Sequence, residues 1–238
     1  MNAVIENPIV KLIEKLEEQK NRKRDLIVPA SKIKMTDNLN IEVINNNALG
    51  SAEFFAPNDL IETQLGDRLK IPRGYYQSMK SNLPHLLTEN VNEWLKFNGS
   101  KKYLLRTFTN GEEMGTARAF LSDRYNLIDN YDVLAAGLEA IHKMNVNVEI
   151  RRAEVSETKM YLHVVCPEIE QEAEAFLREY LKDNSAAGNG IISGFVLTNS
   201  EVGRGAFEIR PRAVICKCNN GLIVADERFR KLHLGRIS

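Results

Sequence analysis

The sequence predicts an α+β fold: an antiparallel sheet built from ββα units, with helices packed on one face and a helical region before it. Apolar residues recur at helical spacing in several stretches, and the alternation typical of strands begins near residue 101. The strands are joined by short connections, which favours antiparallel pairing because parallel strands need long crossovers. We expect an amphipathic helix at 1–24 and one domain at 25–238, with a helical part at 57–98 and a ββαββαββ part at 101–225.

The first helix is predicted from a cap and an apolar stripe. Asn7 can cap it, and Pro8 suits the first helical position, where a backbone N–H has no partner. The basic end at 20–24 either complements the helix dipole or forms the phosphate-binding tip of an arm that packs on a neighbouring subunit. The stripe consists of Ile5, Ile9, Leu12, Ile13 and Leu16.

Residues 25–55 are expected to be strand-like or irregular, with a turn at Asn45-Asn-Asn47. Three short helices then follow Asn58, Pro72 and Pro84. The aromatic side chains of the second and third helices are expected in the core rather than on a binding surface. They are Tyr75, Tyr76 and Trp94.

Strand pairs alternate with helices from residue 101 onward. Asn110-Gly111 is the strongest hairpin signal, because both residues tolerate the positive φ angles of a two-residue turn. Asn130 is expected to cap a helix that ends at Met144. The other predicted elements are strands at 101–109, 114–121, 146–151 and 158–166, an acidic helix at 169–182, and strands at 191–199 and 206–218.

The composition is that of an ordinary globular protein. Hydrophobic residues make up 43% of the 238 residues and charged residues 27%. No apolar run approaches the ~20 residues that cross a membrane, and the N-terminus does not resemble a secretory signal. Three cysteines, Cys166, Cys216 and Cys218, are an odd number for a disulfide framework, so we expect a reducing cytoplasm and no membrane partner.

The chain has 32 basic and 32 acidic residues. This balance counts against a dedicated high-affinity nucleic-acid binder, which would be strongly basic. The charges are nevertheless segregated: residues 168–183 hold six acids and two bases, and residues 201–238 hold eight bases and four acids. Such segregation permits a basic face on a neutral protein.

Motifs for metal or nucleotide chemistry are incomplete, so we predict no catalytic residue, no metal and no cofactor. Cys216 and Cys218 share one strand face, but structural zinc needs four ligands and no second pair exists. The glycine-rich stretch at 188–194 precedes a strand, whereas a dinucleotide loop must precede a helix.

Arginines on the predicted strands form the main candidate site. In the last long strand Glu208, Arg210 and Arg212 share one face because side chains alternate. Guanidinium groups bind phosphate through two hydrogen bonds, and an aromatic ring can stack on a base. The alternative is that the arginines only pair with Glu208, Glu201 or Asp123. The predicted nucleic-acid-binding residues are Arg106, Arg118, Arg124, Tyr125, Arg204, Arg210 and Arg212.

The connection between the last two long strands is a second candidate. It is longer than a two-residue turn, and its glycines permit close approach of a ligand or another backbone. A plain wide hairpin is the alternative. The predicted binding loop consists of Asn199, Ser200, Glu201, Gly203 and Gly205.

Several ordered segments between about residues 25 and 235 resemble a phage- and plasmid-associated family, domain of unknown function 932. The resemblance implies a mobile-element origin and action in the cytoplasm of a bacterial host. Members continue into a helical part beyond His233-Leu-Gly235, so the chain is expected to lack that extension. The matching segments are Asp25-Leu-Ile-Val-Pro-Ala-Ser31, Leu65-Gly-Asp-Arg-Leu-Lys-Ile-Pro72, Val91-Asn-Glu-Trp-Leu95, Leu104-Leu-Arg-Thr-Phe108, Ala117-Arg-Ala-Phe-Leu-Ser-Asp-Arg-Tyr125, Ile128-Asp-Asn130 and Ser193–Leu222.

These observations lead to three hypotheses about function. The first is a nucleic-acid-binding protein, such as a single-strand DNA annealing, recombination or replication accessory protein, which assembles into homo-oligomers through its N-terminal helix. The second is a module that binds a host protein, for example a defence component, through the 199–205 loop. The third is an enzyme whose site forms only in space, from Asp123, Glu201, His163 or Cys216.

Overall fold

The computed structural model describes residues 7–44, 51–111, 113–168, 191–215, 222–224 and 229–231. The chain forms two compact units. Unit 1 contains the described residues of Met1–Glu17 and Leu127–His233, and unit 2 those of Glu18–Asn126. The division between the units thus falls inside the span that the sequence assigns to one domain.

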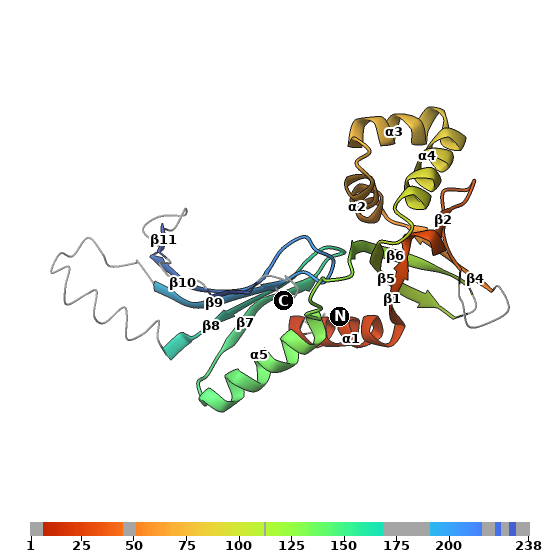
Figure 1. Ribbon diagram of the computed structural model, residues 1–238. Helices are drawn as coiled ribbons and strands as arrows, with labels where there is room; N and C mark the ends of the chain where they lie inside the picture. Colours follow the sequence, from red (N-terminus) through yellow and green to blue (C-terminus); the bar gives the residue numbers. More distant parts are fainter. Residues whose placement is uncertain are drawn as a thin grey trace, which may run out of the picture. The chain divides into compact units, whose positions relative to one another are not determined.

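Unit 2 is built on a mixed six-stranded sheet with the order β1-β5-β6-β4-β3-β2. Neighbouring strands pair antiparallel except β4 and β6, which run parallel. The chain between these two strands contains three helices and β5, which together supply the long crossover that parallel pairing requires (Figure 1). The strands are β1 (Lys23–Pro29), β2 (Ile33–Met35), β3 (Ile41–Ile44), β4 (Ala52–Pro57), β5 (Lys102–Asn110) and β6 (Glu113–Ser122), with the short helix η1 (Ala30–Lys32) after β1.

Three helices of unit 2 begin where the sequence predicts them. Asn58 caps the first one, since its side chain accepts a hydrogen bond from the Ile61 N–H at 3.0 Å. Lys70 ends that helix in the left-handed conformation, with a φ of 64°. The helices pack their apolar faces into the core of the unit, where Phe55 and Phe120 also lie. They are α2 (Asp59–Leu69), α3 (Arg73–Asn82) and α4 (Pro84–Phe97).

The aromatic residues of α3 and α4 divide between core and surface. Tyr76 is buried, as predicted, and this burial raises the pKa of its hydroxyl. The prediction is wrong for Tyr75 and Trp94, which are 56% and 40% exposed. Helical periodicity fixes which side of a helix a residue occupies, but it does not fix how much of that side a neighbouring element covers.

Unit 1 is built on an antiparallel sheet with the order β11-β10-β9-β8-β7, and β12 also pairs with β10. Helices α1 and α5 lie on the same face of this sheet (Figure 1). Leu12, Leu16 and Leu134 from these helices share one apolar core with Leu162 and Leu197 of the sheet. The elements are α1 (Pro8–Arg22, of which residues up to Glu17 belong to this unit), α5 (Asn130–Met144), β7 (Glu149–Val155), β8 (Met160–Val165), β9 (Ile191–Asn199), β10 (Phe207–Ile215), β11 (Leu222–Val224) and β12 (Phe229–Lys231).

The α+β class is confirmed, but the strands form two sheets instead of one, and one of the two is mixed. The Asn110-Gly111 hairpin is present, and Gly111 has the positive φ that such a turn needs, 67°. The apolar stripe of α1 is used inside unit 1, so subunit assembly through that stripe gains no support. The turn at 45–47, the helix at 169–182, the glycine-rich stretch up to residue 190 and the pair Cys216 and Cys218 lie outside the described residues.

Candidate nucleic-acid interface

The sheet of unit 1 has two chemically different faces. Its described helices cover one face, where the β10 residues Phe207 and Ile209 contribute to the core. Side chains alternate along a strand, so the intervening β10 residues Glu208, Arg210 and Arg212 point to the other face. The shared strand face predicted for these three residues is therefore confirmed.

Strand register extends this face across the sheet. Arg210 lies opposite Val196 of β9, which lies opposite His163 of β8, which lies opposite Arg152 of β7. The register of β7 shifts between Ile150 and Arg152, so Arg151 is an additional residue at this row. One row across four strands thus brings a histidine and several arginines together. We call Arg151, Arg152, Tyr161, His163, Arg210 and Arg212 the basic face.

Three arginines of the basic face form ion pairs within their own strands. Arg210 contacts Glu208 at 2.6 Å, Arg152 contacts Glu154 at 2.7 Å and Arg151 contacts Glu149 at 3.1 Å. The arginine side chains are 44–61% exposed in these pairs, so solvent weakens the attraction and each pair contributes less than about 1 kcal/mol. Pairing with Glu208 was one predicted alternative for Arg210, and it is confirmed.

Tyr161 and His163 sit among these arginines on β8. The guanidinium carbon of Arg152 lies 5.2 Å from the centre of the Tyr161 ring, a cation–π distance. Burial first, and then the charges of Arg212 and Arg151, lower the pKa of His163 below its ordinary value of 6.5. The two arginine charges thus add to an effect that comes mainly from burial.

Arg212 differs from its neighbours in its hydrogen bonding. Its Nε is buried and has no hydrogen-bond partner among the described residues. A buried unpaired donor is costly, about 1–3 kcal/mol, and an anion that reaches it would remove that cost. Among the described residues of the basic face, Arg212 is thus the one with a buried guanidinium donor that has no partner.

The predicted site residues of unit 2 have other surroundings. Arg106 is 0% exposed and forms two hydrogen bonds with Asp25, Nε to Oδ1 at 2.9 Å and Nη2 to Oδ2 at 3.1 Å. No phosphate can reach it, so its predicted role is wrong. Arg118 is also buried, with its guanidinium carbon 3.9 Å from the centre of the Phe108 ring.

Arg124 and Tyr125 follow β6 in a turn that Ser122 stabilises. The Ser122 side chain accepts a hydrogen bond from the Arg124 N–H at 3.3 Å, and its carbonyl accepts one from the Tyr125 N–H at 2.9 Å. Arg124 is exposed and Tyr125 half-buried. Both belong to unit 2, whereas Arg204, Arg210 and Arg212 belong to unit 1.

The 199–205 loop is largely a structural element. Asn199, Ser200 and Glu201 are buried, and their side chains bond to the chain itself. Asn199 donates to the Ile128 carbonyl and to Asn130 Oδ1, both at 2.9 Å. These three residues are unavailable to a partner, which corrects the prediction of a binding loop. The exposed residues of this connection are Gly203, with a φ of 75°, Arg204 and Gly205.

The same loop caps α5. Asp129, not Asn130, is the residue before the helix, and its side chain makes no capping hydrogen bond. The carboxylate of Glu201 takes that role: its Oε1 accepts a hydrogen bond from the buried Asn130 N–H at 2.7 Å. Ser200 Oγ donates to the Thr158 carbonyl at 2.7 Å and ties the loop to the β7–β8 turn.

The residues of the enzyme hypothesis lie in different surroundings. Glu201 is engaged with α5, Asp123 belongs to unit 2 and His163 to unit 1, and Cys216 lies outside the described residues. Within the described part of the chain, no three His, Cys, Asp or Glu side chains gather closely enough to hold a metal ion. No described helix is long and apolar enough to cross a membrane.

Sequence reasoning found β10 but missed the neighbouring members of the basic face: Arg151, Arg152, Tyr161 and His163. The sequence does indicate that Tyr161 and His163 share one face of a strand, because they alternate with the apolar residues Leu162 and Val164. The register that sets them beside β10 could not be obtained from either strand alone.

Comparison of the chain with protein-family models, with curated proteins and with solved structures gave no significant match. The resemblance to domain of unknown function 932 therefore stays a prediction from the sequence.

Proposed function

We propose that the protein binds single-stranded nucleic acid on the basic face of unit 1. The main support is the strand register, which places Arg210, His163, Arg151 and Arg152 in one row on the sheet face opposite the helices. Guanidinium groups on a sheet can follow a phosphate backbone. Arg212 adds a partly exposed guanidinium, whose buried Nε has no acceptor among the described residues.

Tyr161 supplies the second component of single-strand binding. A tyrosine beside arginines can stack on a base while the guanidinium groups hold the flanking phosphates. The glutamates that pair with Arg151, Arg152 and Arg210 would be displaced or shared when phosphate binds. We therefore expect moderate affinity with a marked salt dependence rather than very tight binding.

The biological setting that we propose follows from the family resemblance. A phage- or plasmid-encoded protein that binds single strands would act in annealing, recombination or replication in the cytoplasm of a bacterial host. Assembly into a homo-oligomer along the strand belongs to the same proposal, through a surface other than the apolar stripe of α1.

Removing two arginines from the basic face tests this function. For Arg210→Gln together with Arg212→Gln, we expect the affinity for fluorescein-labelled oligo(dT) to fall about 10- to 100-fold, because two charge-assisted contacts are lost. The slope of log K against log salt should become shallower by about 0.7 for each phosphate contact removed. Fluorescence anisotropy across a salt titration of the full chain measures both quantities.

Arg73→Gln is the matched control, since Arg73 is an exposed arginine at the start of α3 in unit 2. It should leave the affinity and the salt slope unchanged. Absence of oligo(dT) binding by the unaltered protein at low salt would reject the proposal. An equal loss in the Arg73 variant would show that binding is spread over the whole surface.

His163 makes binding depend on pH in a stated direction. Its pKa is lowered in the free protein, and a bound phosphate would raise that pKa, so binding takes up a proton. We expect oligo(dT) binding to become tighter as the pH falls toward the lowered pKa of His163, and His163→Gln should flatten this dependence. The unaltered protein and the His163→Gln variant both keep the neighbouring charged residues Glu149, Glu154 and Glu208. The difference between their pH dependences therefore comes from His163.

A further inference from the structure

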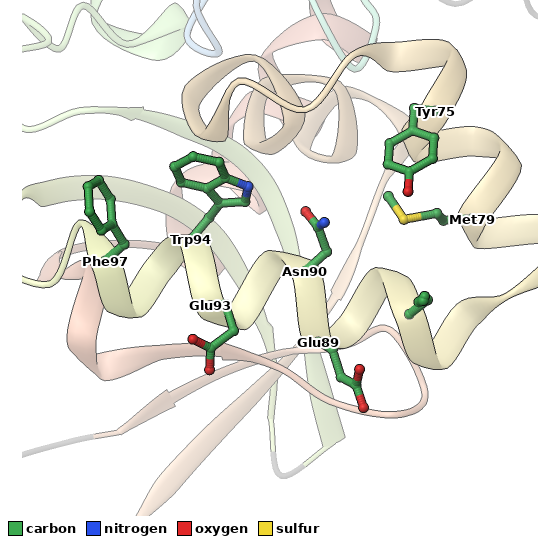
Figure 2. Close-up of a pocket in the computed structure, with 8 residues that line it drawn as sticks. Tyr75, Met79, Glu89, Asn90, Glu93, Trp94 and Phe97 are labelled. Carbon is green, nitrogen blue, oxygen red and sulfur yellow. The ribbon is translucent and has the colours of Figure 1, made fainter.

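A groove lies between α3 and α4 in unit 2 and takes no part in the proposed nucleic-acid site. Its volume is about 550 Å³. Figure 2 shows Tyr75 and Met79 entering it from α3, and Trp94, Asn90 and Phe97 from α4. Leu86 completes the apolar lining. A groove between two helices is a common binding site for a third helix.

The aromatic residues of this groove are unusually exposed. Phe97 is 80% exposed, and together with Tyr75 and Trp94 it presents a wide apolar surface to solvent. Trp94 and Phe97 form an edge-to-face pair with ring centres 5.7 Å apart, so the two rings are adjacent in the groove. Clustered Trp and Tyr side chains are among the residues that most often dominate protein interfaces.

Acidic and polar groups accompany the rings. Glu89 and Glu93 also line the groove, because they continue the row on α4 that contains Leu86 and Phe97. Figure 2 shows their carboxylates on the flank of α4 opposite Asn90 and Trp94, and both glutamates are exposed. Glu93 contacts Lys96 at 3.5 Å, a solvent-exposed pair that holds the carboxylate only weakly. In the groove, the buried Asn90 Oδ1 has no hydrogen-bond partner among the described residues.

We propose that this groove binds an amphipathic helix of a partner protein, one with an apolar stripe flanked by lysine or arginine. The rings and Met79 would take the stripe, and Glu89 and Glu93 would pair with the basic flanks. Charge decides the class of partner: carboxylates at the rim repel phosphate, so a nucleic acid is disfavoured here. The inference stands independently of the proposed binding of single strands by unit 1.

Trp94 is the only tryptophan of the chain, so it reports directly on the groove. The probe is a tryptophan-free amphipathic peptide with a leucine stripe and lysine flanks, compared with the same peptide carrying glutamate flanks. We expect the lysine peptide to shift Trp94 emission to the blue as the ring is buried, and the glutamate peptide to leave it unchanged. Phe97→Ala should weaken the lysine peptide about tenfold.

Reversing the charges supplies the matched variant. Glu89→Lys with Glu93→Lys changes two exposed side chains, and it should invert the preference between the two peptides. Far-UV circular dichroism confirms that the variant is folded. No shift with either peptide, or a preference that survives charge reversal, would overturn the proposal. A blue shift that grows with protein concentration alone would assign the groove to a second copy, and quenching by oligo(dT) to nucleic acid; either result overturns it.

Discussion

Asp25→Ala is expected to lower the free energy of unfolding of unit 2 by about 3–5 kcal/mol. Asp25 lies directly opposite Arg106 in the β1–β5 pair, and its carboxylate accepts two hydrogen bonds from the guanidinium. Arg106 is 0% exposed, so solvent screens its charge little. Alanine therefore removes the charge that balances a guanidinium held inside the sheet.

Urea unfolding followed by Trp94 fluorescence measures this effect, because the single tryptophan lies in the same unit as Asp25. Glu53→Ala is the matched control. Glu53 forms a two-pronged pair with Arg24 at 2.5 and 2.8 Å, but that arginine is 43% exposed, so a loss below about 1 kcal/mol is expected. Equal losses in the two variants would contradict the distinction between buried and exposed pairs.

A double replacement separates the buried charge from the contact itself. Asp25→Leu with Arg106→Met removes both charges and keeps apolar side chains of similar size across the strands. We expect this protein to be more stable than Asp25→Ala alone, because the buried positive charge is removed together with the carboxylate. The comparison uses the same fluorescence signal and urea range.

Glu201→Ala is expected to destabilise unit 1 by about 2–3 kcal/mol. The Glu201 carboxylate accepts a hydrogen bond from the Asn130 N–H at the start of α5, and both residues are buried. Alanine leaves that N–H without its acceptor and removes a negative charge from the positive end of the helix. Glu201→Gln keeps an oxygen acceptor, so its loss should be clearly smaller.

Amide hydrogen exchange shows where the stability is lost. Exchange should accelerate first at the N-terminal turn of α5, around Asp132 and Val133, in the alanine variant. Glu139→Ala is the control on the same helix, since it removes only the exposed pair with Lys143 and should cost about 0.3–0.5 kcal/mol. Unchanged protection of the first turn in Glu201→Ala would rule out the capping role.

Local signals gave most of the helices and one hairpin correctly. Asn58 caps α2, prolines precede α3 and begin α4, and Gly111 directly follows the last residue of β5, Asn110, in the β5–β6 hairpin. Each of these depends on backbone preferences and on contacts within a few residues, which a single stretch of sequence contains. The predicted cap of α5 was wrong, because the acceptor belongs to Glu201, which is 71 residues away in the sequence from Asn130.

The arginines of the candidate site also show which properties the local sequence determines and which depend on tertiary structure. Alternation along β10 by itself determined that Glu208, Arg210 and Arg212 share a face, because it depends only on strand geometry. Tertiary structure decided which arginines are accessible: Arg106 has the same side chain as Arg210, yet Asp25 and the sheet bury it completely. It also decided that the 199–205 loop holds α5 and that Trp94 lines a groove. Burial and strand register depend on segments far apart in the chain, and no local pattern contains them.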